Sequence, residues 1–163
     1  MKTQNQIRLI KMGYVVTLLV VILFSLKDAS RGFEEGYTDS GKGGLLDLVK
    51  GLFILIIMFF SSRVLVYLYR FINSIEIGNV FSTENAGRLT RMGWYCTMIP
   101  FLLFIYNVMV YTDQSNNRQD LLFKIIENVD FQIWLLIFGL TLLTIAYVFK
   151  KGIELQQEND LTI

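Results

Sequence analysis

The stretch that decides the fold is the polar segment NVFSTENAGRLTRMGW, residues 79–94, which lies between long apolar segments. Ser82 has the features of a helix N-cap, because a helix-forming run follows it with Glu84 in the first turn, where an acid favours the positive end of the helix dipole. The run leads on through Arg91 directly into apolar sequence. We therefore predict a cytoplasmic linker over residues 70–91 that contains a short amphipathic membrane-surface helix, followed at once by a membrane span.

Four apolar segments predict four transmembrane helices. They cover residues 8–26, 45–69, 92–111 and 131–149. Roughly 20 apolar residues suffice to cross a bilayer core as a helix. The chain of 163 residues is 53% hydrophobic, with a mean hydropathy of +0.48, which is too apolar for a soluble domain of this length. The expected fold is an all-α integral membrane four-helix bundle, made of two tandem helical hairpins in one domain, residues 1–163.

Polar loops should join the two spans of each hairpin. Residues 27–44 hold five glycines and mixed charges, which is typical of a turn-rich loop. Residues 112–130 form a second polar loop, with a short helix expected around residues 121–127. Asp47 and Lys50 lie three residues apart at the start of the second span, so we expect them to pair on one helical face.

Individual spans carry further signals. The basic start and short apolar run of the first span also fit a signal peptide, but SLKDAS at residues 25–30 offers no small-x-small cleavage site, which favours a retained span. Pro100 should bend the third helix, because its ring removes a backbone donor and crowds the preceding turn. Gly139 should allow close contact between helices.

Basic residues near the span ends predict the orientation in the membrane. With both termini in the cytoplasm, the inner segments hold eight Lys and Arg residues and the outer loops hold six. The bias is sharpest at the span ends, where Lys11, Arg70, Arg91 and Lys150 all mark one side. We therefore expect a cytoplasmic N-terminus and a cytoplasmic tail over residues 150–163.

An internal repeat links distant parts of the chain. The phrase KMGYVVT at residues 11–17 resembles RMGWYCT at residues 91–97, and IEI at residues 75–77 resembles IEL at residues 153–155. Because both hairpins have the same topology, such a repeat is parallel and is related by an axis along the membrane normal. Duplication and coincidence both stay open, since short apolar matches arise by chance in membrane chains.

The residue types offer little for catalysis or metal binding. The sequence has no histidine, the commonest general base and metal ligand. Its single cysteine, Cys96, can form neither an internal disulfide nor a cysteine metal site. P-loop, dinucleotide-binding and HExxH motifs are absent from the sequence. We expect no enzyme activity, no cofactor and no metal, and the near balance of 15 basic and 14 acidic residues argues against nucleic acid as a direct partner.

Arg63 is a charged residue inside a predicted span and allows two interpretations. In one, it is a buried cation that binds an anionic ligand in a cavity shared with Asn107 and Thr144. In the other, it snorkels: Arg70 lies seven residues on, about 10 Å along the helix, and an arginine side chain covers most of that distance to the interface. We favour snorkelling, and we expect Asn107 and Thr144 to bond between helices or to their own backbone.

The leading functional hypothesis is a cytoplasmic face that binds a protein partner. The residues that would form it are Ser82, Glu84, Asn85, Arg88 and Arg91 of the linker, with Glu154, Glu158 and Leu161 of the tail. In one interpretation the acidic tail residues meet Arg88 and Arg91 and close a surface from both halves of the chain. In the other, the tail only extends the fourth helix by a turn or two and then frays.

Two motifs resemble a known bacterial family. FSTEN at residues 81–85, followed by RL and then RMGW, is similar to the family phrase PFSEEN…RLRRIGW, and GIELQQENDLTI at residues 152–163 is similar to its closing G.EL..E..LTI. Over essentially its whole length the chain resembles the YoaS-like family of small four-span membrane proteins of unknown function. Val80 stands where the family usually has proline, which affects only the rigidity of the helix entry.

The resemblance implies a multi-pass protein of a bacterial inner (plasma) membrane, without established catalytic residues. Family members are often encoded beside a small helix-turn-helix regulator, which suggests a cytoplasmic transcription regulator as the partner. The alternative hypothesis is a small transport or ligand-sensing protein that uses a cavity near Arg63. A homo-oligomer is compatible with both hypotheses.

Overall fold

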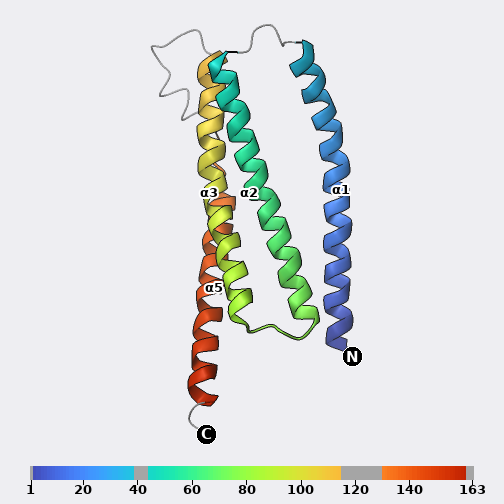
Figure 1. Ribbon diagram of the computed structural model, residues 1–163, viewed down its shortest axis with the longest axis vertical. Helices are drawn as coiled ribbons and strands as arrows, with labels where there is room; N and C mark the ends of the chain where they lie inside the picture. The colour runs from blue at the N-terminus through green and yellow to red at the C-terminus, as the bar shows by residue number, and fades with distance from the viewer. Residues whose placement is uncertain (1, 39–43, 115–129, 161–163) are drawn as a thin grey trace.

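The computed structural model describes residues 2–38, 44–114 and 130–160. This part of the chain forms four helices and no strand: α1 (Lys2–Thr38), α2 (Leu45–Glu76), α3 (Thr83–Gln114) and α5 (Ile133–Asp160). All four helices are long and apolar enough to span a membrane (Figure 1). The prediction of an all-α, four-span membrane protein is confirmed.

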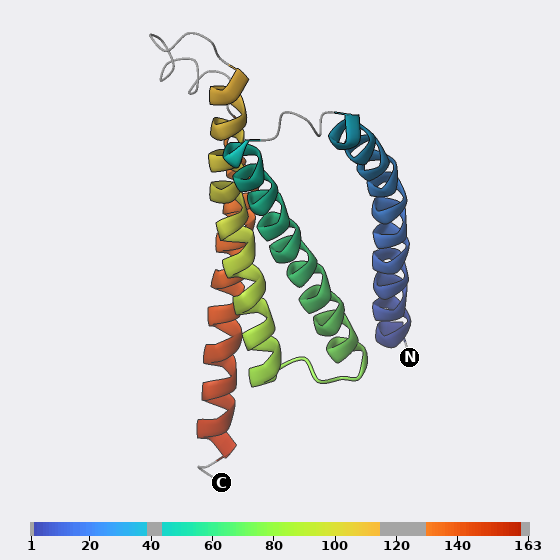
Figure 2. The same ribbon diagram turned by 45° about the horizontal axis from the view of Figure 1, so that its top comes forward.

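The helices pack around α3. This helix contacts both α2 and α5, whereas α1 contacts only α2 among the described residues. In both views α1 lies close to α2 near the N-terminus of the chain and diverges from it toward the other end (Figures 1 and 2). Both chain ends lie at the same end of the bundle, called here the terminal end (Figure 1). The hairpin of α3 and α5 is therefore closed along its length, whereas the hairpin of α1 and α2 is open at one end.

Close packing of α3 against α5 depends on two glycines. A Cβ atom added at Gly139 would lie 2.7 Å from the backbone nitrogen of Thr97, and one added at Gly93 would lie 2.7 Å from Cγ of Leu143. Contacts this short leave no room for a side chain. The predicted role of Gly139 in close helix contact is confirmed, and Gly93 has the same role one turn nearer the terminal end.

A small hydrophobic core connects α3 to both of its neighbours. It is formed by Tyr67 of α2, Leu89 and Met92 of α3, and Ala146 of α5. Met92 is only 1% exposed. Rings from α2 and α5 also meet at this level, where the centroids of Phe71 and Phe149 are 6.2 Å apart. The core therefore lies toward the terminal end of the bundle.

The helices are longer than the predicted spans, and one predicted loop is wrong. Residues 27–38 were expected in a turn-rich loop but continue α1 to Thr38. The segment contains no proline and several helix-forming residues, so helical hydrogen bonding continues after the apolar character ends. The helix predicted around residues 121–127 lies outside the described residues.

The helix predicted before the third span runs into that span without a break. Thr83–Gln114 is one continuous helix, because nothing between the polar start and the apolar part interrupts its backbone hydrogen bonds. Its predicted N-cap is confirmed: the Asn85 backbone N–H donates to Oγ of Ser82 at 3.2 Å. Pro100 lies inside the helix and is almost fully buried. The bend expected there stays a prediction.

The start of α2 is stabilised as the sequence predicts. Lys50 Nζ lies 3.2 Å from Oδ1 of Asp47. The Asp47 carboxylate also accepts a hydrogen bond of 3.2 Å from the Gly44 backbone N–H. This carboxylate therefore satisfies an otherwise unpaired donor at the helix N-terminus.

Candidate functional site

Asn85 organises the turn between α2 and α3. Its side chain is 0% exposed, and its Nδ2 donates to the carbonyl oxygens of Asn79 at 2.7 Å and Val80 at 3.1 Å. Ser74 of α2 donates from Oγ to the same Asn79 carbonyl at 3.0 Å. Gly78 takes the positive φ of +89° that the turn requires. A buried amide thus fixes where α3 begins relative to the end of α2.

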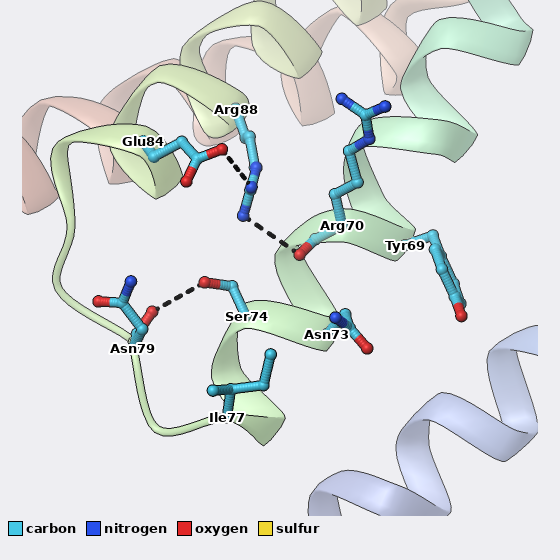
Figure 3. A pocket seen from close by; sticks show the side chains of 8 residues that line it. All are labelled: Tyr69, Arg70, Asn73, Ser74, Ile77, Asn79, Glu84 and Arg88. Carbon is cyan, nitrogen blue, oxygen red and sulfur yellow. Dashed lines mark hydrogen bonds and ion pairs between the residues drawn. The ribbon is translucent and has the colours of Figure 1, made fainter.

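The predicted linker residues divide over two sides of α3. Glu84 and Arg88 face α2, where Arg88 Nη2 lies 2.5 Å from Glu84 Oε1. Arg88 Nη1 donates to Asn85 Oδ1 at 2.7 Å and to the Arg70 carbonyl at 3.3 Å. Figure 3 shows this arrangement, with Arg88 and Glu84 opposite Arg70 and Ser74 of α2. Buried Asn85 and the capping Ser82 therefore position the charged pair.

These side chains border a polar hollow of about 470 Å³ at the terminal end (Figure 3). This space is called the polar hollow below, and it is lined by Tyr69, Arg70, Asn73, Ser74, Ile77, Asn79, Glu84 and Arg88. Arg70 makes no ion pair within the described part of the chain. Because Arg88 is balanced by Glu84, the polar hollow keeps one net positive charge, that of Arg70.

Arg91 lies between α2 and α5, because its Nη1 also donates to Oη of Tyr67 in α2 at 3.3 Å. It borders a second hollow of about 530 Å³, called the α3–α5 hollow. The lining residues are Thr83, Ala86, Gly87, Thr90 and Arg91 of α3, with Lys150, Ile153, Glu154 and Gln157 of α5. Ala86 and Ile153 are buried, so small and apolar side chains form the floor and charged ones the rim. Two of the predicted face residues, Arg91 and Glu154, thus line one hollow.

The acidic tail residues are placed differently from one another. Glu154 pairs with Lys151 of its own helix, with Nζ to Oε2 at 2.6 Å. Glu158 is exposed beyond it, and Leu161 lies outside the described residues. α5 continues to Asp160, so the interpretation in which the tail extends the fourth helix holds for that segment. The direct meeting of tail carboxylates with Arg88 and Arg91 stays a prediction.

Arg63 ends on an aromatic cluster between α2 and α3. Its Nη2 donates to Oη of Tyr67 at 2.6 Å, and its guanidinium lies 4.9 Å from the Tyr67 ring centroid. Arg91 Nη1 donates to the same hydroxyl at 3.3 Å. The Nε of Arg63 is buried without a hydrogen-bond partner. The side chain points toward the terminal end, as snorkelling requires, but it stops at Tyr67, one turn short of Arg70.

The structure does not bring the other proposed cavity residues to Arg63. Asn107 lies twelve residues beyond Tyr95, which stacks on Tyr67 at 6.2 Å, so it is about 18 Å farther along α3. Thr144 is exposed, and its hydroxyl donates to the Leu140 carbonyl at 3.0 Å. Thr144 therefore bonds to its own backbone, as the simpler interpretation predicted.

Sequence reasoning missed the contact that holds α1. Lys11 Nζ lies 2.6 Å from Oε2 of Glu76 and donates to Oδ1 of Asn73 at 2.7 Å. Arg8 Nε lies 3.8 Å from Oε1 of Glu76. Tyr14 Oη donates to the Leu65 carbonyl at 2.7 Å. The available signal was Glu76, a carboxylate just past the second span, on the side where the basic N-terminus was predicted.

The described residues hold no group of three or more His, Cys, Asp or Glu side chains arranged for a metal ion. Cys96 is buried with a free thiol. What the terminal end does offer is two hollows with charged borders, one on each side of α3. Such concave surfaces suit binding.

Comparison with known proteins places the chain in a family. The model of DUF2975, described as a protein of unknown function, matches residues 10–163. No curated protein and no solved structure matches the chain. The match confirms the expectation of an uncharacterised family, whereas the narrower YoaS-like name stays a prediction. Since the family model covers nearly the whole of this four-span membrane protein, the chain belongs to the DUF2975 family.

Proposed function

We propose that this protein is a non-enzymatic, multi-pass protein of a bacterial inner membrane whose cytoplasmic face binds a soluble regulatory protein. Its termini would lie in the cytoplasm, because the basic residues at the span ends gather at the terminal end. The four apolar helices supply the membrane anchor. The partner that the family resemblance suggests is a helix-turn-helix transcription regulator, so contact with DNA would be indirect.

The observation that carries this proposal is the α3–α5 hollow. Its floor is formed by small or apolar residues at successive turns, among them Ala86, Thr90 and Ile153. Its rim carries Arg91, Lys150 and Glu154. An apolar floor between charged borders is what an amphipathic helix of a partner needs. Two cations against one carboxylate favour a partner helix with acidic flanks.

At Gly87 the floor of the α3–α5 hollow is open. A Cβ atom added there would meet no atom within 4 Å, so the backbone of α3 is accessible at this point. The contrast with Gly93, one and a half turns farther along the same helix, is clear, because there α5 covers the backbone. The surface of α3 at Gly87 is therefore left uncovered by α5, although Ala86 beside it is buried.

A capture experiment with matched variants tests the proposal. Tagged protein is extracted from native membranes in mild detergent, and co-purified soluble proteins are identified by mass spectrometry. Lys150→Glu changes the rim of the hollow, whereas Arg70→Glu makes the same charge change at the same end of the bundle, on a residue that lines the other hollow and makes no ion pair among the described residues. Gly87→Leu fills the floor, and Gly13→Leu is its control at another open glycine.

The proposal predicts a DNA-binding regulator captured by the wild type, Arg70→Glu and Gly13→Leu. Capture should fall at least about tenfold for Lys150→Glu and Gly87→Leu, since loss of a central contact costs upward of about 1.4 kcal/mol. Equal capture by all five proteins, or capture of no DNA-binding regulator by any of them, would contradict it.

A further inference from the structure

We propose that the protein binds one anionic phospholipid between α1 and α2, with its headgroup at the terminal end. Two hollows of different chemistry meet there. The polar hollow described above shares Tyr69 and Arg70 with an apolar hollow of about 510 Å³ on the α1 side of α2. A joined polar and apolar site suits an amphiphile, because each part of the molecule finds its own environment.

The apolar hollow is shaped for an acyl chain. Leu18 and Ile22 of α1 face Leu65 and Val66 of α2 across it. Of the two hydroxyls in its lining, that of Ser62 already donates to the Met58 carbonyl at 2.8 Å, and Tyr69 lies at the junction with the polar hollow. Both views show α1 and α2 diverging in this direction (Figures 1 and 2). The space between them widens away from the terminal end, along the direction a lipid tail follows.

The polar hollow supplies the charge for a phosphate. Figure 3 shows the Arg70 side chain on the flank of α2, between Arg88 of α3 and Tyr69, which faces α1. Arg88 is engaged by Glu84 and Asn85, whereas Arg70 is exposed and makes no ion pair among the described residues. Arginine is well suited to phosphate, because its planar guanidinium donates two parallel hydrogen bonds.

Neighbouring charges strengthen the attraction for an anion. Lys11 of α1 lies 5.7 Å from the Tyr69 ring centroid, and with Arg8 it surrounds the single carboxylate of Glu76. Around the junction, four cations (Arg8, Lys11, Arg70 and Arg88) face two carboxylates (Glu76 and Glu84), an excess of two positive charges. A zwitterionic lipid would gain less from this excess than an anionic one.

The order of the two hollows along α2 matches the order of head and tail. The apolar hollow is lined by Ser62, Leu65 and Val66, the polar one by Asn73, Ser74 and Ile77, and Tyr69 and Arg70 lie between the two sets and line both hollows. A phospholipid of the leaflet at the terminal end has its phosphate at that end and its chains toward the bilayer centre. A free anion would use only half of the site. The geometry therefore favours a lipid over a soluble phosphate.

Native mass spectrometry of the delipidated full-length chain in detergent tests the inference. Phosphatidylglycerol and zwitterionic phosphatidylethanolamine with the same chains are added in separate titrations, and bound lipids per chain are counted. We expect one phosphatidylglycerol to bind at a concentration about tenfold lower than phosphatidylethanolamine, as one charge-assisted contact allows. sn-Glycerol 1-phosphate at millimolar concentration should not displace it.

Two pairs of variants locate the site. Arg70→Gln should abolish the preference for phosphatidylglycerol, while Lys151→Gln, an equal loss of charge at the same end, should keep it. Val66→Trp fills the apolar hollow and should weaken binding of both lipids, while Val148→Trp on an exposed face of α5 should not. Both Val66 and Val148 are exposed, so neither change disturbs a packed core.

Several results would overturn the inference. Equal affinity for the two lipids would remove the role of charge. An unchanged preference in Arg70→Gln, or unchanged binding in Val66→Trp, would place the lipid elsewhere. Displacement by sn-glycerol 1-phosphate would show that the polar hollow alone holds a soluble phosphate.

Discussion

Two copies of one sequence phrase differ sharply in their packing. In α1, residues 11–17 read KMGYVVT; in α3, residues 91–97 read RMGWYCT. Local structure is the same, because Thr17 and Thr97 both donate to the glycine carbonyl four residues earlier, at 2.9 and 2.8 Å. Burial is opposite: the first methionine, Met12, is 62% exposed, whereas Met92 is 1% exposed.

This difference shows that the neighbouring helices, rather than the repeated sequence, determine which residues are buried. α3 lies between α2 and α5, so its glycine admits the backbone of a partner, while nothing lies within 4 Å of a Cβ added at Gly13. The basic residue that opens each phrase does reach α2 in both cases, since Lys11 pairs with Glu76 and Arg91 bonds to Tyr67. The bundle is thus a packed unit of three helices with a fourth held mainly at one end.

Glycine substitutions should show the largest difference between loosely packed α1 and closely packed α3 and α5. Gly139→Ala should lower the free energy of unfolding by about 2 kcal/mol or more, because the added methyl group would overlap the backbone of α3 near Thr97. Gly93→Ala should cost less, since the Leu143 side chain can shift. Gly13→Ala should be neutral or stabilising by up to about 1 kcal/mol, as helix propensity favours alanine. Chemical unfolding in mixed micelles measures all three; equal effects at Gly13 and Gly139 would show that α1 is as tightly packed as α3.

Loss of the buried amide in the α2–α3 turn should have the next largest effect. Asn85→Ala removes the donors to the Asn79 and Val80 carbonyls and the acceptor for Arg88, at a cost of about 2 kcal/mol. Asn107→Ala, at a partly buried asparagine of the same helix, should change stability by less than about 0.5 kcal/mol. Thermal unfolding followed by circular dichroism compares them. A smaller loss for Asn85→Ala than for Asn107→Ala would show that the turn does not hold α3 in place.

The contact that holds α1 should have the smallest effect on stability but a visible effect on motion. Glu76→Gln removes the carboxylate shared by Arg8 and Lys11, which costs less than about 1 kcal/mol at a partly exposed site. In a Cys96→Ala background, spin labels at exposed positions 24 and 55 report the distance between α1 and α2. Their distance distribution should broaden in Glu76→Gln.

Labels at positions 98 and 138 provide the control for that measurement. They lie on α3 and α5, whose packing does not involve Glu76, so their distribution should stay the same. If the distance between positions 24 and 55 also stays unchanged, α1 is held along its length by contacts other than the Glu76 pair.

The span centres and several local features could be predicted from the sequence. Hydropathy locates the four helices, because apolar length is set by the bilayer core. The Ser82 cap, the Asp47–Lys50 pair and the close contact at Gly139 follow from rules that act within one or two turns. The helix ends could not be predicted in the same way, since helical hydrogen bonding in residues 27–38 continues after the apolar character ends.

The candidate site was predictable only in part, because side-chain direction depends on helix rotation. Arg88 and Arg91 are three residues apart and looked like members of one face. Arg88 lines the polar hollow beside α2, whereas Arg91 lines the α3–α5 hollow and also donates to Tyr67 of α2. Asn85 looked like a surface residue, yet it is buried because the turn needs its amide. Gln157 and Lys150 carry no distinctive signal and join the site only through the packing of α5.

The most direct test of the proposed docking surface is photo-crosslinking in living cells. A photoreactive amino acid at Gln157 would lie inside the α3–α5 hollow, and one at exposed Tyr147, nearly three turns earlier on α5, would lie outside it. Our account predicts a discrete adduct with a soluble regulator from position 157, its loss in Lys150→Glu, and no such adduct from position 147. A regulator crosslinked equally from both positions, or none from position 157, would contradict the claim that this hollow binds a partner.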